Sequence, residues 1–389
     1  MRRRLLIILA TLLTAILLAL VGLKLIYGRG ATYAGVGGTP VLAADELEMA
    51  IRPELPPGCV TVTHDGRVFF DTHPFAVPAR FAAPHVFELV DGQARPWPSA
   101  EAQDLFVAPF GLTADRQGRL WLIEPATLDR SATRLLAFDL ASGALAYELV
   151  LPEGEARFAQ DLRISADGRH AVLADTGAFR FTPGQLVVVD LEERRIVRRF
   201  RDPSLDPQDW IIRRYDGAPH RVFWGLLTFQ VGVDGIAFSD DGQWLWYATM
   251  SHDTLYRLSA SALLDPSADD DAVAKTIETI GPKPLSDGIE ATPAGTVLVT
   301  DVENGGVVEI AADGTLRRLS ASEAVIWADS VSIAPDGTIY LTDSAIPAYL
   351  QPDLRPPSRE QLDAAGPFAL YRLRDPARAG GSHESTKAE

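Results

Sequence analysis

One short unit recurs along the chain and limits its possible folds more than any other feature. The unit is an alternating run of apolar residues, a turn that ends in glycine, and a second apolar run that ends in a polar residue. Turn residues between two such runs are typical of a β-hairpin. Six copies occur, at residues 60–71, 111–124, 162–175, 236–249, 289–301 and 331–343.

Further β-type runs follow most of these hairpins and extend the unit to four strands. Third strands are expected at 86–92, 135–143, 186–193, 255–261 and 307–314. Fourth strands are expected, for instance, at 144–151, 195–200 and 316–320. Successive turn glycines lie 52, 50, 74, 53 and 42 residues apart, at Gly66, Gly118, Gly168, Gly242, Gly295 and Gly337. This pattern is typical of propeller blades and predicts an all-β fold, a six-bladed β-propeller over residues 47–375.

The last repeat lacks an outer strand of its own. Its third strand is expected at 368–373, but the tail at 376–389 is polar and is expected to be disordered. The only spare alternating run is 47–52, so we expect the N-terminal strand to close the ring beside the C-terminal one. Two insertions break the period, at 201–233 and 345–367. Loops this long are uncommon unless they are functional, the alternative being that they pack over a face of the propeller.

The N-terminus carries a candidate membrane anchor at residues 1–27. Three arginines at positions 2–4 precede 5–26, which is apolar except for two threonines and one lysine. A bilayer core needs about 20 such residues. The positive-inside rule places the arginines in the cytoplasm and the propeller outside it, in the periplasm if the cell is bacterial. A cleaved signal peptide, giving a secreted protein, is the alternative, although its apolar core is usually about 7–15 residues long. The Gly-rich stretch 28–46 is expected to be a flexible linker.

Composition excludes some classes of function. The formal net charge is −16, so the chain is not expected to bind nucleic acid. An acidic surface suits solubility, and it also suits cations or amines. The single cysteine, Cys59, excludes an internal disulfide and a zinc site with several cysteines, and its place in an alternating run favours burial.

Aspartates recur at the ends of the predicted hairpins. Asp287 and Asp301 are fourteen residues apart, which places them side by side at the open end of their hairpin. Since the innermost strands of a propeller line its channel, we expect an inner ring of four aspartates, Asp161, Asp234, Asp287 and Asp329.

Carboxylates that converge in a channel repel one another unless a positive charge lies among them. The inner ring therefore predicts a divalent cation, for which calcium is the best match and magnesium a poorer one. The alternative is that each aspartate accepts hydrogen bonds from backbone N–H groups of its own turn and only orders the strand.

Residues near the same face are candidates for ligand binding and catalysis. His73, Phe110, Asp301 and Asp343 are assigned to ligand binding, the two aspartates belonging to an outer ring. Asp287 and His252 are the catalytic candidates, His252 as a proton-transfer group. Ordinary roles in loops are the alternative for both histidines.

The second half of the chain resembles the major royal jelly protein/yellow family. Segments 232–258, 281–307 and 326–344 are similar to successive D-G-I-A-x-S, S-D-G and P-D-S-x-S-x-x-x-G patterns of that family, with alanine at 328 in place of the proline. The resemblance covers roughly residues 55–345. It implies a six-bladed propeller outside the cytoplasm that binds a small ligand such as an amine, often without established catalysis.

A more distant similarity connects the chain to the gluconolactonase/senescence-marker-protein family. There, a divalent cation held in the channel activates lactone hydrolysis, and the resemblance would place its ligands at Asp234, Asp287 and Asp161. The family's glutamate ligand would fall near 56–58, where the sequence is Pro-Pro-Gly, and Asp329 lies in a different blade. A small-ligand-binding propeller, a metal-dependent lactonase and a protein-interaction scaffold are therefore the three candidate functions.

Overall fold

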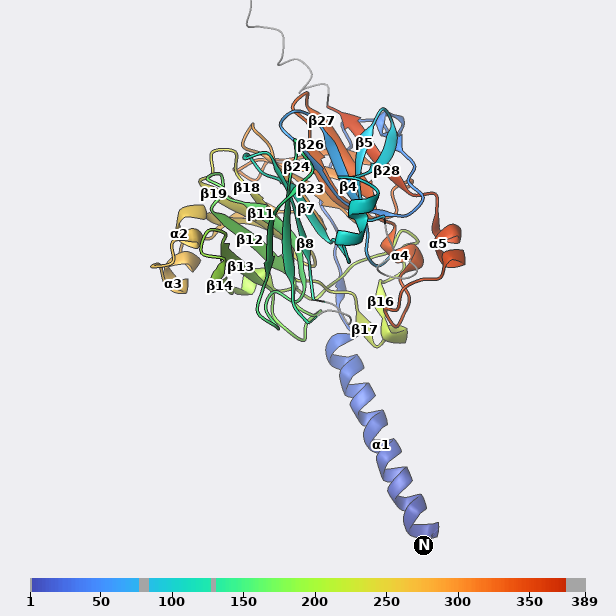
Figure 1. The fold of residues 1–389 in the computed structure, drawn as a ribbon. Helices are drawn as coiled ribbons and strands as arrows, with labels where there is room; N and C mark the ends of the chain where they lie inside the picture. The colour runs from blue at the N-terminus through green and yellow to red at the C-terminus, as the bar shows by residue number, and fades with distance from the viewer. Residues whose placement is uncertain (1, 77–83, 127–130, 376–389) are drawn as a thin grey trace, which may run out of the picture.

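A computed structural model describes residues 2–76, 84–126 and 131–375, and most of these form a six-bladed β-propeller (Figure 1). The fold class predicted from the repeats is therefore confirmed, and each predicted hairpin forms the two inner strands of one blade. The predicted disordered tail at 376–389 lies outside the described residues.

Each blade is a four-stranded antiparallel sheet. Blades one and two consist of β3 (Pro57–Val62), β4 (Val68–Thr72), β5 (Val86–Val90), β6 (Gln93–Pro96), β7 (Gly111–Ala114), β8 (Arg119–Glu124), β9 (Arg134–Asp139) and β10 (Leu145–Val150). Blades three and four consist of β11 (Ala159–Ile164), β12 (His170–Asp175), β13 (Gln185–Asp190), β14 (Arg195–Phe200), β18 (Val233–Phe238), β19 (Trp244–Thr249), β20 (Thr254–Ser259) and β21 (Glu278–Pro282). Two short helices, α2 (Ala260–Leu264) and α3 (Asp270–Ala274), separate β20 from β21.

Blade six is completed by the N-terminal strand, as expected. Blade five consists of β22 (Ile289–Ala291), β23 (Val297–Asp301), β24 (Gly306–Ile310) and β25 (Leu316–Ala321), and blade six of β26 (Ala328–Ile333), β27 (Thr338–Asp343), β28 (Ala369–Arg374) and β2 (Glu48–Ile51). β2 pairs antiparallel with β28, with Glu48 opposite Arg372. The innermost strands contact one another in the order β3, β7, β11, β18, β22 and β26, and β26 returns to β3. The ring is closed because strands from the two ends of the chain share one sheet.

The hairpin turns explain why glycine recurs. All six turn glycines have φ between 70° and 85°, a conformation that other residues adopt at a cost. In the turn of blade four, Oδ1 of Asp241 accepts the N–H of Gln243, while Gly242 takes the positive φ. Asp-Gly turns of this kind set the register of each hairpin.

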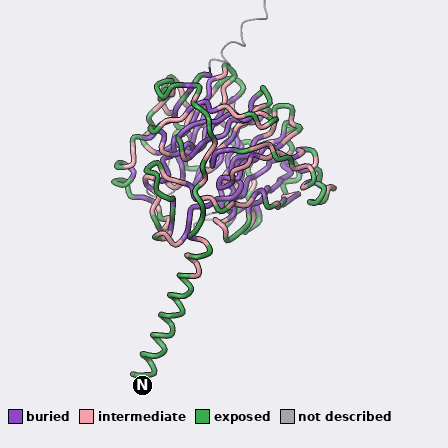
Figure 2. The backbone as a smooth tube through the Cα atoms, turned by 180° about the vertical axis from the view of Figure 1, so that it is seen from behind, coloured by how far each residue is buried: buried purple, intermediate pink, exposed green. Residues whose placement is uncertain are grey.

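The apolar core lies between neighbouring blades (Figure 2). Val172 and Val188 of blade three, for example, pack in one cluster with Ile236 and Leu245 of blade four. Every residue of β13 is buried, because a central strand of a blade is covered on both faces by its neighbours. Stacking of the blades therefore holds the inner strands, and the channel between them, in place.

Both insertions fold over one face of the propeller. The first contains β15 (Trp210–Ile211), β16 (Arg221–Val222) and β17 (Leu227–Thr228), and the second contains α4 (Ile346–Tyr349) and α5 (Arg359–Ala365). Phe229 of the first insertion and Ile346 of the second share one apolar cluster with Trp327, which lies just before β26. The insertions thus cover the face at which the inner strands begin.

Helix α1 (Arg2–Tyr27) extends away from this same face (Figure 1). It is long and apolar enough to cross a membrane, and no part of its most apolar stretch is buried by the protein. The segment 28–46, expected to be a flexible linker, instead lies along the propeller. Within it, β1 (Ala31–Thr32) pairs with β15, and the N–H of Leu42 donates to the carbonyl of Leu319 at 3.0 Å. These backbone hydrogen bonds and the burial of Leu42 account for the difference.

Candidate functional site

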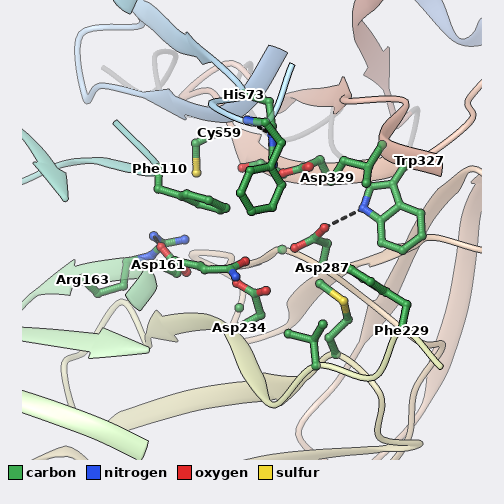
Figure 3. Close-up of a pocket in the computed structure, with 18 residues that line it drawn as sticks. Cys59, His73, Phe110, Asp161, Arg163, Phe229, Asp234, Asp287, Trp327 and Asp329 are labelled. Atoms are coloured by element: carbon green, nitrogen blue, oxygen red, sulfur yellow. Dashed lines mark hydrogen bonds and ion pairs between the residues drawn. The ribbon is translucent and has the colours of Figure 1, made fainter. Parts of the chain in front are cut away.

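The inner strands begin around a small cavity at one end of the central channel (Figure 3). Its volume is about 50 Å³, and all four aspartates of the predicted inner ring line it: Asp161, Asp234, Asp287 and Asp329. Because a water molecule occupies about 30 Å³, this space suits an ion or one or two small groups. The inner ring inferred from the hairpin repeats is therefore brought together as expected.

At the beginning of three inner strands, irregular pairing directs the aspartate side chains toward the channel. The register shifts at Asp161 in β11, after Val233 in β18 and after Ala328 in β26. Bulges of this kind commonly aim a side chain at a functional site. In blade five, the N–H of Asp287 donates to Oγ1 of Thr300 at 3.0 Å, so this hairpin continues beyond β22.

Three of the four carboxyl groups have no basic partner among the described residues. Burial raises the pKa of Asp234 and of Asp287 well above the ordinary value, and the nearby carboxylates raise both further. Burial also raises the pKa of Asp329 to about 7. In the described part of the chain, Oδ2 of Asp234 and Oδ2 of Asp329 are buried and accept no hydrogen bond. A positive charge at this position would relieve both the desolvation and the repulsion.

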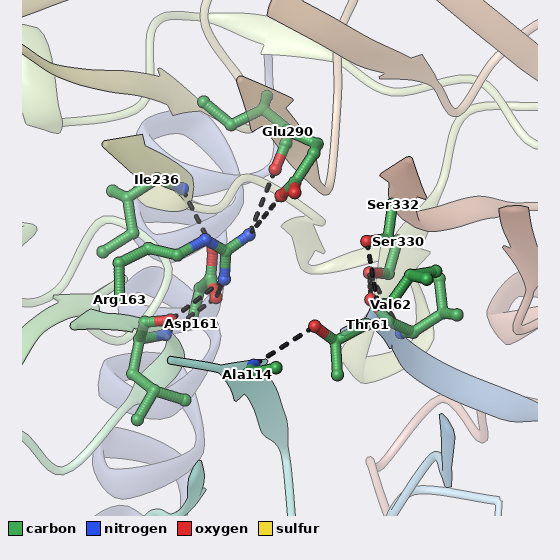
Figure 4. Close-up of polar contacts among 12 residues, drawn as sticks. Thr61, Val62, Ala114, Asp161, Arg163, Ile236, Glu290, Ser330 and Ser332 are labelled. Carbon is green, nitrogen blue, oxygen red and sulfur yellow. Dashed lines mark hydrogen bonds and ion pairs between the residues drawn. The ribbon is translucent and has the colours of Figure 1, made fainter. Parts of the chain in front are cut away.

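Asp161 differs from the other three because it is neutralised (Figure 4). Its Oδ1 accepts Nη1–H of Arg163 at 2.5 Å, and its Oδ2 accepts the N–H of Ile236 at 3.0 Å. Arg163 also approaches Glu290 at 3.6 Å, where burial raises the pKa of the glutamate to about 7. Arg163 lines both the small cavity and a larger channel space of about 800 Å³ beyond it. The ion pair therefore separates the two halves of the channel.

Aromatic side chains form the opposite wall of the cavity. The His73 ring lies 5.2 Å from the rings of both Phe75 and Phe110, and the N–H of Phe75 donates to Nδ1 of the histidine at 3.2 Å. Burial lowers the pKa of His73 to about 3, so the ring is uncharged at neutral pH. His73 and Phe110, both assigned to ligand binding, line the cavity as expected.

The remaining predicted residues do not line the cavity. His252 accepts the N–H of Thr254 at Nδ1, packs against Tyr256, and has its pKa lowered to about 4 by burial. Asp301 pairs with Arg318 at 2.8 Å. Asp343 accepts the N–H groups of Ile326 and Trp327. The alternative, in which an aspartate orders nearby backbone, thus describes Asp343, and in the inner ring it also fits Asp161, which accepts the N–H groups of Leu162 and Ile236. It does not account for the unpaired Oδ2 atoms of Asp234 and Asp329.

The model of one protein family matches residues 107–356, more than half of the chain, and its description is major royal jelly protein. The chain belongs to the major royal jelly protein family. The resemblance seen in segments 232–258, 281–307 and 326–344 is thereby confirmed. Among curated proteins, no sequence matches this chain.

Solved structures place this royal jelly family member among other propellers. A gluconolactonase from Xanthomonas campestris is 14% identical, with a TM-score of 0.54, and the match covers 89% of this chain and 98% of that one. A calcium-binding protein, regucalcin, from Agrobacterium tumefaciens is 12% identical, with a TM-score of 0.52 and coverage of 87% and 95%. At such low identity these matches establish a shared fold.

Several residues that line the cavity of this family member were not predicted from the sequence. Trp327 stands two positions before Asp329, and its indole Nε1 donates to Oδ2 of Asp287 at 2.6 Å. Phe229 and Met250 reach the cavity from a long insertion and from the end of β19, where no repeated pattern marks them. Cys59, expected to be buried, is half-buried and lines the cavity. Trp327 and Met250 both lie inside segments that resemble the family, which is the one signal that could have found them.

Among the described residues no glutamate lines the cavity, and the segment 56–58 contains none. Asp71 lies beside that segment, where its Oδ1 accepts the N–H of Cys59 at 2.7 Å. Burial raises the pKa of Asp71 well above its ordinary value. The carboxyl groups among the described residues that line the small cavity thus all belong to aspartates.

Proposed function

We propose that this protein is a membrane-anchored propeller, facing outside the cytoplasm, that binds a small ligand at the mouth of its central channel together with a divalent cation. One observation carries the proposal. Asp234, Asp287 and Asp329 converge on one cavity, lack basic partners in the described part of the chain, and leave two buried oxygens without hydrogen bonds. A buried cluster of this charge needs a cation or must hold protons.

Calcium suits this donor set best. Its preferred ligands are carboxylate and carbonyl oxygens in flexible arrangements, whereas zinc prefers histidine and cysteine. In the described residues no three His, Cys, Asp or Glu side chains form a ready-made metal site. Binding would therefore draw the three carboxyl groups together and displace the protons that their raised pKa values favour in the cation-free protein.

The residues around the aspartates would hold the ligand. Phe110 and Phe229 offer apolar and aromatic contact area, and uncharged His73 offers a ring nitrogen. Arg163 and Asp161 close the far end of the cavity, so that a ligand would enter from the face covered by the insertions. A bound cation would supply positive charge for the oxygen atoms of the ligand.

The length and composition of α1 support anchoring, and the three arginines at positions 2–4 support a cytoplasmic position for the N-terminus. A cleaved signal peptide remains the alternative for the same helix. Retention of the N-terminal peptide in membrane fractions, read by mass spectrometry, distinguishes the two.

Lactone hydrolysis is the second candidate function. The shared fold with a gluconolactonase and the carboxyl of Asp287 in the cavity favour it. In this candidate function Asp287, which lines the cavity, would act on a ligand carbonyl, whereas His252 lies outside the cavity lining and would not transfer a proton there. The absence of a glutamate from the lining distinguishes this site from the pattern expected of that family.

Calcium titration of the full chain in detergent, after chelator treatment, tests the proposal. We expect calcium binding that Asp287→Asn and Asp329→Asn each weaken by at least about tenfold. Asp241→Asn, in an exposed turn, is the matched control and should bind as the wild type does. Equal affinity in the wild type and Asp287→Asn would contradict the proposal, and no calcium binding at all would favour an interaction scaffold. Lactone turnover that is abolished by chelator and by Asp287→Asn would establish the second candidate instead.

A further inference from the structure

A second, apolar chamber adjoins the aspartate cavity. Its volume is about 450 Å³, within the range of pockets that hold organic ligands. The two spaces share five lining residues, Phe75, Phe110, Gln160, Phe229 and Val231. The chamber therefore continues the mouth of the channel, with an acidic end and an apolar body.

The walls of this chamber connect directly to the membrane helix. Phe179 lines the chamber, and Phe181, two residues later, packs on the ring of Tyr27 at the end of α1, 4.5 Å away. Phe223 also lines the chamber, and the carbonyl of Gly225, two residues later, accepts a hydrogen bond from the Lys24 side chain. The chamber thus lies beside the point at which α1 leaves the propeller.

This edge of the propeller exposes aromatic side chains. Trp224 is 76% exposed, Phe181 is 48% exposed, and Phe158, in the chamber wall, is 37% exposed. Phe223 and Trp224 both adopt left-handed backbone conformations, with φ of 49° and 53°. Two consecutive strained residues place one aromatic ring in the chamber wall and the next in solvent, and such strain persists where it serves a function.

Two exposed arginines lie near these aromatic rings, although Asp353 also lines the chamber and the chain as a whole is acidic. Arg157 lines the chamber with its guanidinium 5.8 Å from the Phe158 ring, and both Arg157 and Arg221 are exposed. Aromatic and basic side chains together are characteristic of protein surfaces at the membrane–water interface, where lipid phosphates attract the cations.

We propose that this edge rests in the membrane that α1 spans, and that the chamber takes the hydrocarbon tail of an amphiphile that enters from the bilayer. The inference rests on the proposed function and names its ligand class: an acyl amphiphile whose oxygen-bearing head reaches the cation at the aspartates. The chamber suits an apolar chain because most of its lining is apolar, Arg157 and Asp353 being the charged residues among the described lining.

A photoreactive fatty acid tests this inference directly. The full chain is placed in nanodiscs that contain a fatty acid with a diazirine in its tail, and cross-linked residues are mapped by mass spectrometry. We expect cross-links to the chamber wall, chiefly at Phe158 and Phe179, and we expect added calcium to increase them. Ala178→Trp, which fills the chamber, should reduce chamber cross-links at least fivefold, whereas Ala141→Trp, on an exposed outer turn, should not.

The outcomes separate this inference from the proposed function. Cross-links confined to α1, with none in the chamber wall of the wild type, would overturn the inference even if calcium still binds at the aspartates. Chamber cross-links that do not respond to calcium would support the entry route and count against the cation. Because the wild-type map decides the matter, a folding defect in Ala178→Trp, seen by thermal melting, would leave the test intact.

Discussion

The indole Nε1 of Trp327 donates a hydrogen bond of 2.6 Å to Oδ2 of Asp287, which joins two neighbouring blades at the mouth of the channel. The backbone N–H of the same tryptophan donates to Oδ1 of Asp343 at 2.9 Å. Asp343 of the outer ring therefore positions Trp327, and Trp327 in turn orients the carboxyl group of Asp287 in the inner ring.

Replacing Trp327 with Phe removes the indole donor but keeps an aromatic ring in the core. Residues that orient a metal ligand commonly change metal affinity by about 10–100-fold when they are lost. We expect Trp327→Phe to weaken calcium binding within that range, measured by titration calorimetry. Trp244→Phe, half-buried at the start of β19 beside the hairpin turn of blade four, is the matched control. Unchanged affinity in Trp327→Phe would mean that the hydrogen bond does not position Asp287 for a cation.

Asp329→Asn should stabilise the cation-free protein at pH 8 while it weakens cation binding. The substitution removes a buried charge without a basic partner, and the carboxyl it replaces has a pKa of about 7 in the folded state. We expect the melting temperature without calcium to rise by at least about 2 °C, which corresponds to roughly 1 kcal/mol in a domain of this size. Asp343→Asn should do the opposite, because it disturbs an acceptor of three backbone N–H groups. A lower melting temperature in Asp329→Asn would contradict this account.

Stability without calcium should depend on pH in a defined direction. The pKa of Asp329 is raised from 3.8 to about 7 on folding, so between these values the unfolded chain has released a proton that the folded chain retains. The free energy of unfolding therefore falls as pH rises from about 4 to about 7, by up to about 1.4 kcal/mol per pH unit for one such group. Urea denaturation across this pH range measures the trend, as the difference in free energy of unfolding between the wild type and Asp329→Asn. A difference that is independent of pH would show that Asp329 does not titrate there.

Calcium affinity should rise over the same pH range. A cation requires ionised carboxylates, and the pKa values of Asp234, Asp287 and Asp329 are all raised before it binds. We expect calcium binding to be weak at pH 5 and to strengthen until about pH 8, with proton release in calorimetry that depends on the buffer. Binding of equal strength at pH 5 and pH 8 would exclude these carboxyl groups as the ligands.

Arg163→Met should destabilise the protein through its effect on Asp161. The arginine is the ion-pair partner of this buried carboxylate, and loss of one partner from such a pair typically costs about 3–5 kcal/mol. Asp161→Asn in the same chain should recover much of that loss, which a double-mutant cycle of unfolding free energies measures. Additive effects of the two substitutions would show that the pair does not act as a unit.

The repeats predicted the blades because their signals are local. Alternation along a strand and a glycine in each turn specify one hairpin at a time, and blade closure by 47–52 followed from the outer strand that blade six lacks. The convergence of Asp234, Asp287 and Asp329 followed from equivalent positions in successive hairpins.

Other features were not contained in the repeat pattern. Arg163 stands two residues after Asp161 in β11, a local signal for their ion pair that the repeats did not bring out, whereas Asp301 pairs with Arg318, which lies seventeen residues further along the chain. The contact of 28–46 with the propeller was not predicted. A Gly-rich composition indicates a flexible backbone, but it does not indicate whether the segment finds strands of the propeller with which to form hydrogen bonds.

The position of a bound cation tests the central claim most directly. Terbium replaces calcium in oxygen sites and scatters X-rays anomalously, so crystals of the protein grown with terbium locate the site without assumptions. The account predicts one strong anomalous peak within bonding distance of Asp234, Asp287 and Asp329, and its loss in Asp287→Asn crystals. Peaks found only on surface carboxylates, with none in the channel, would contradict it.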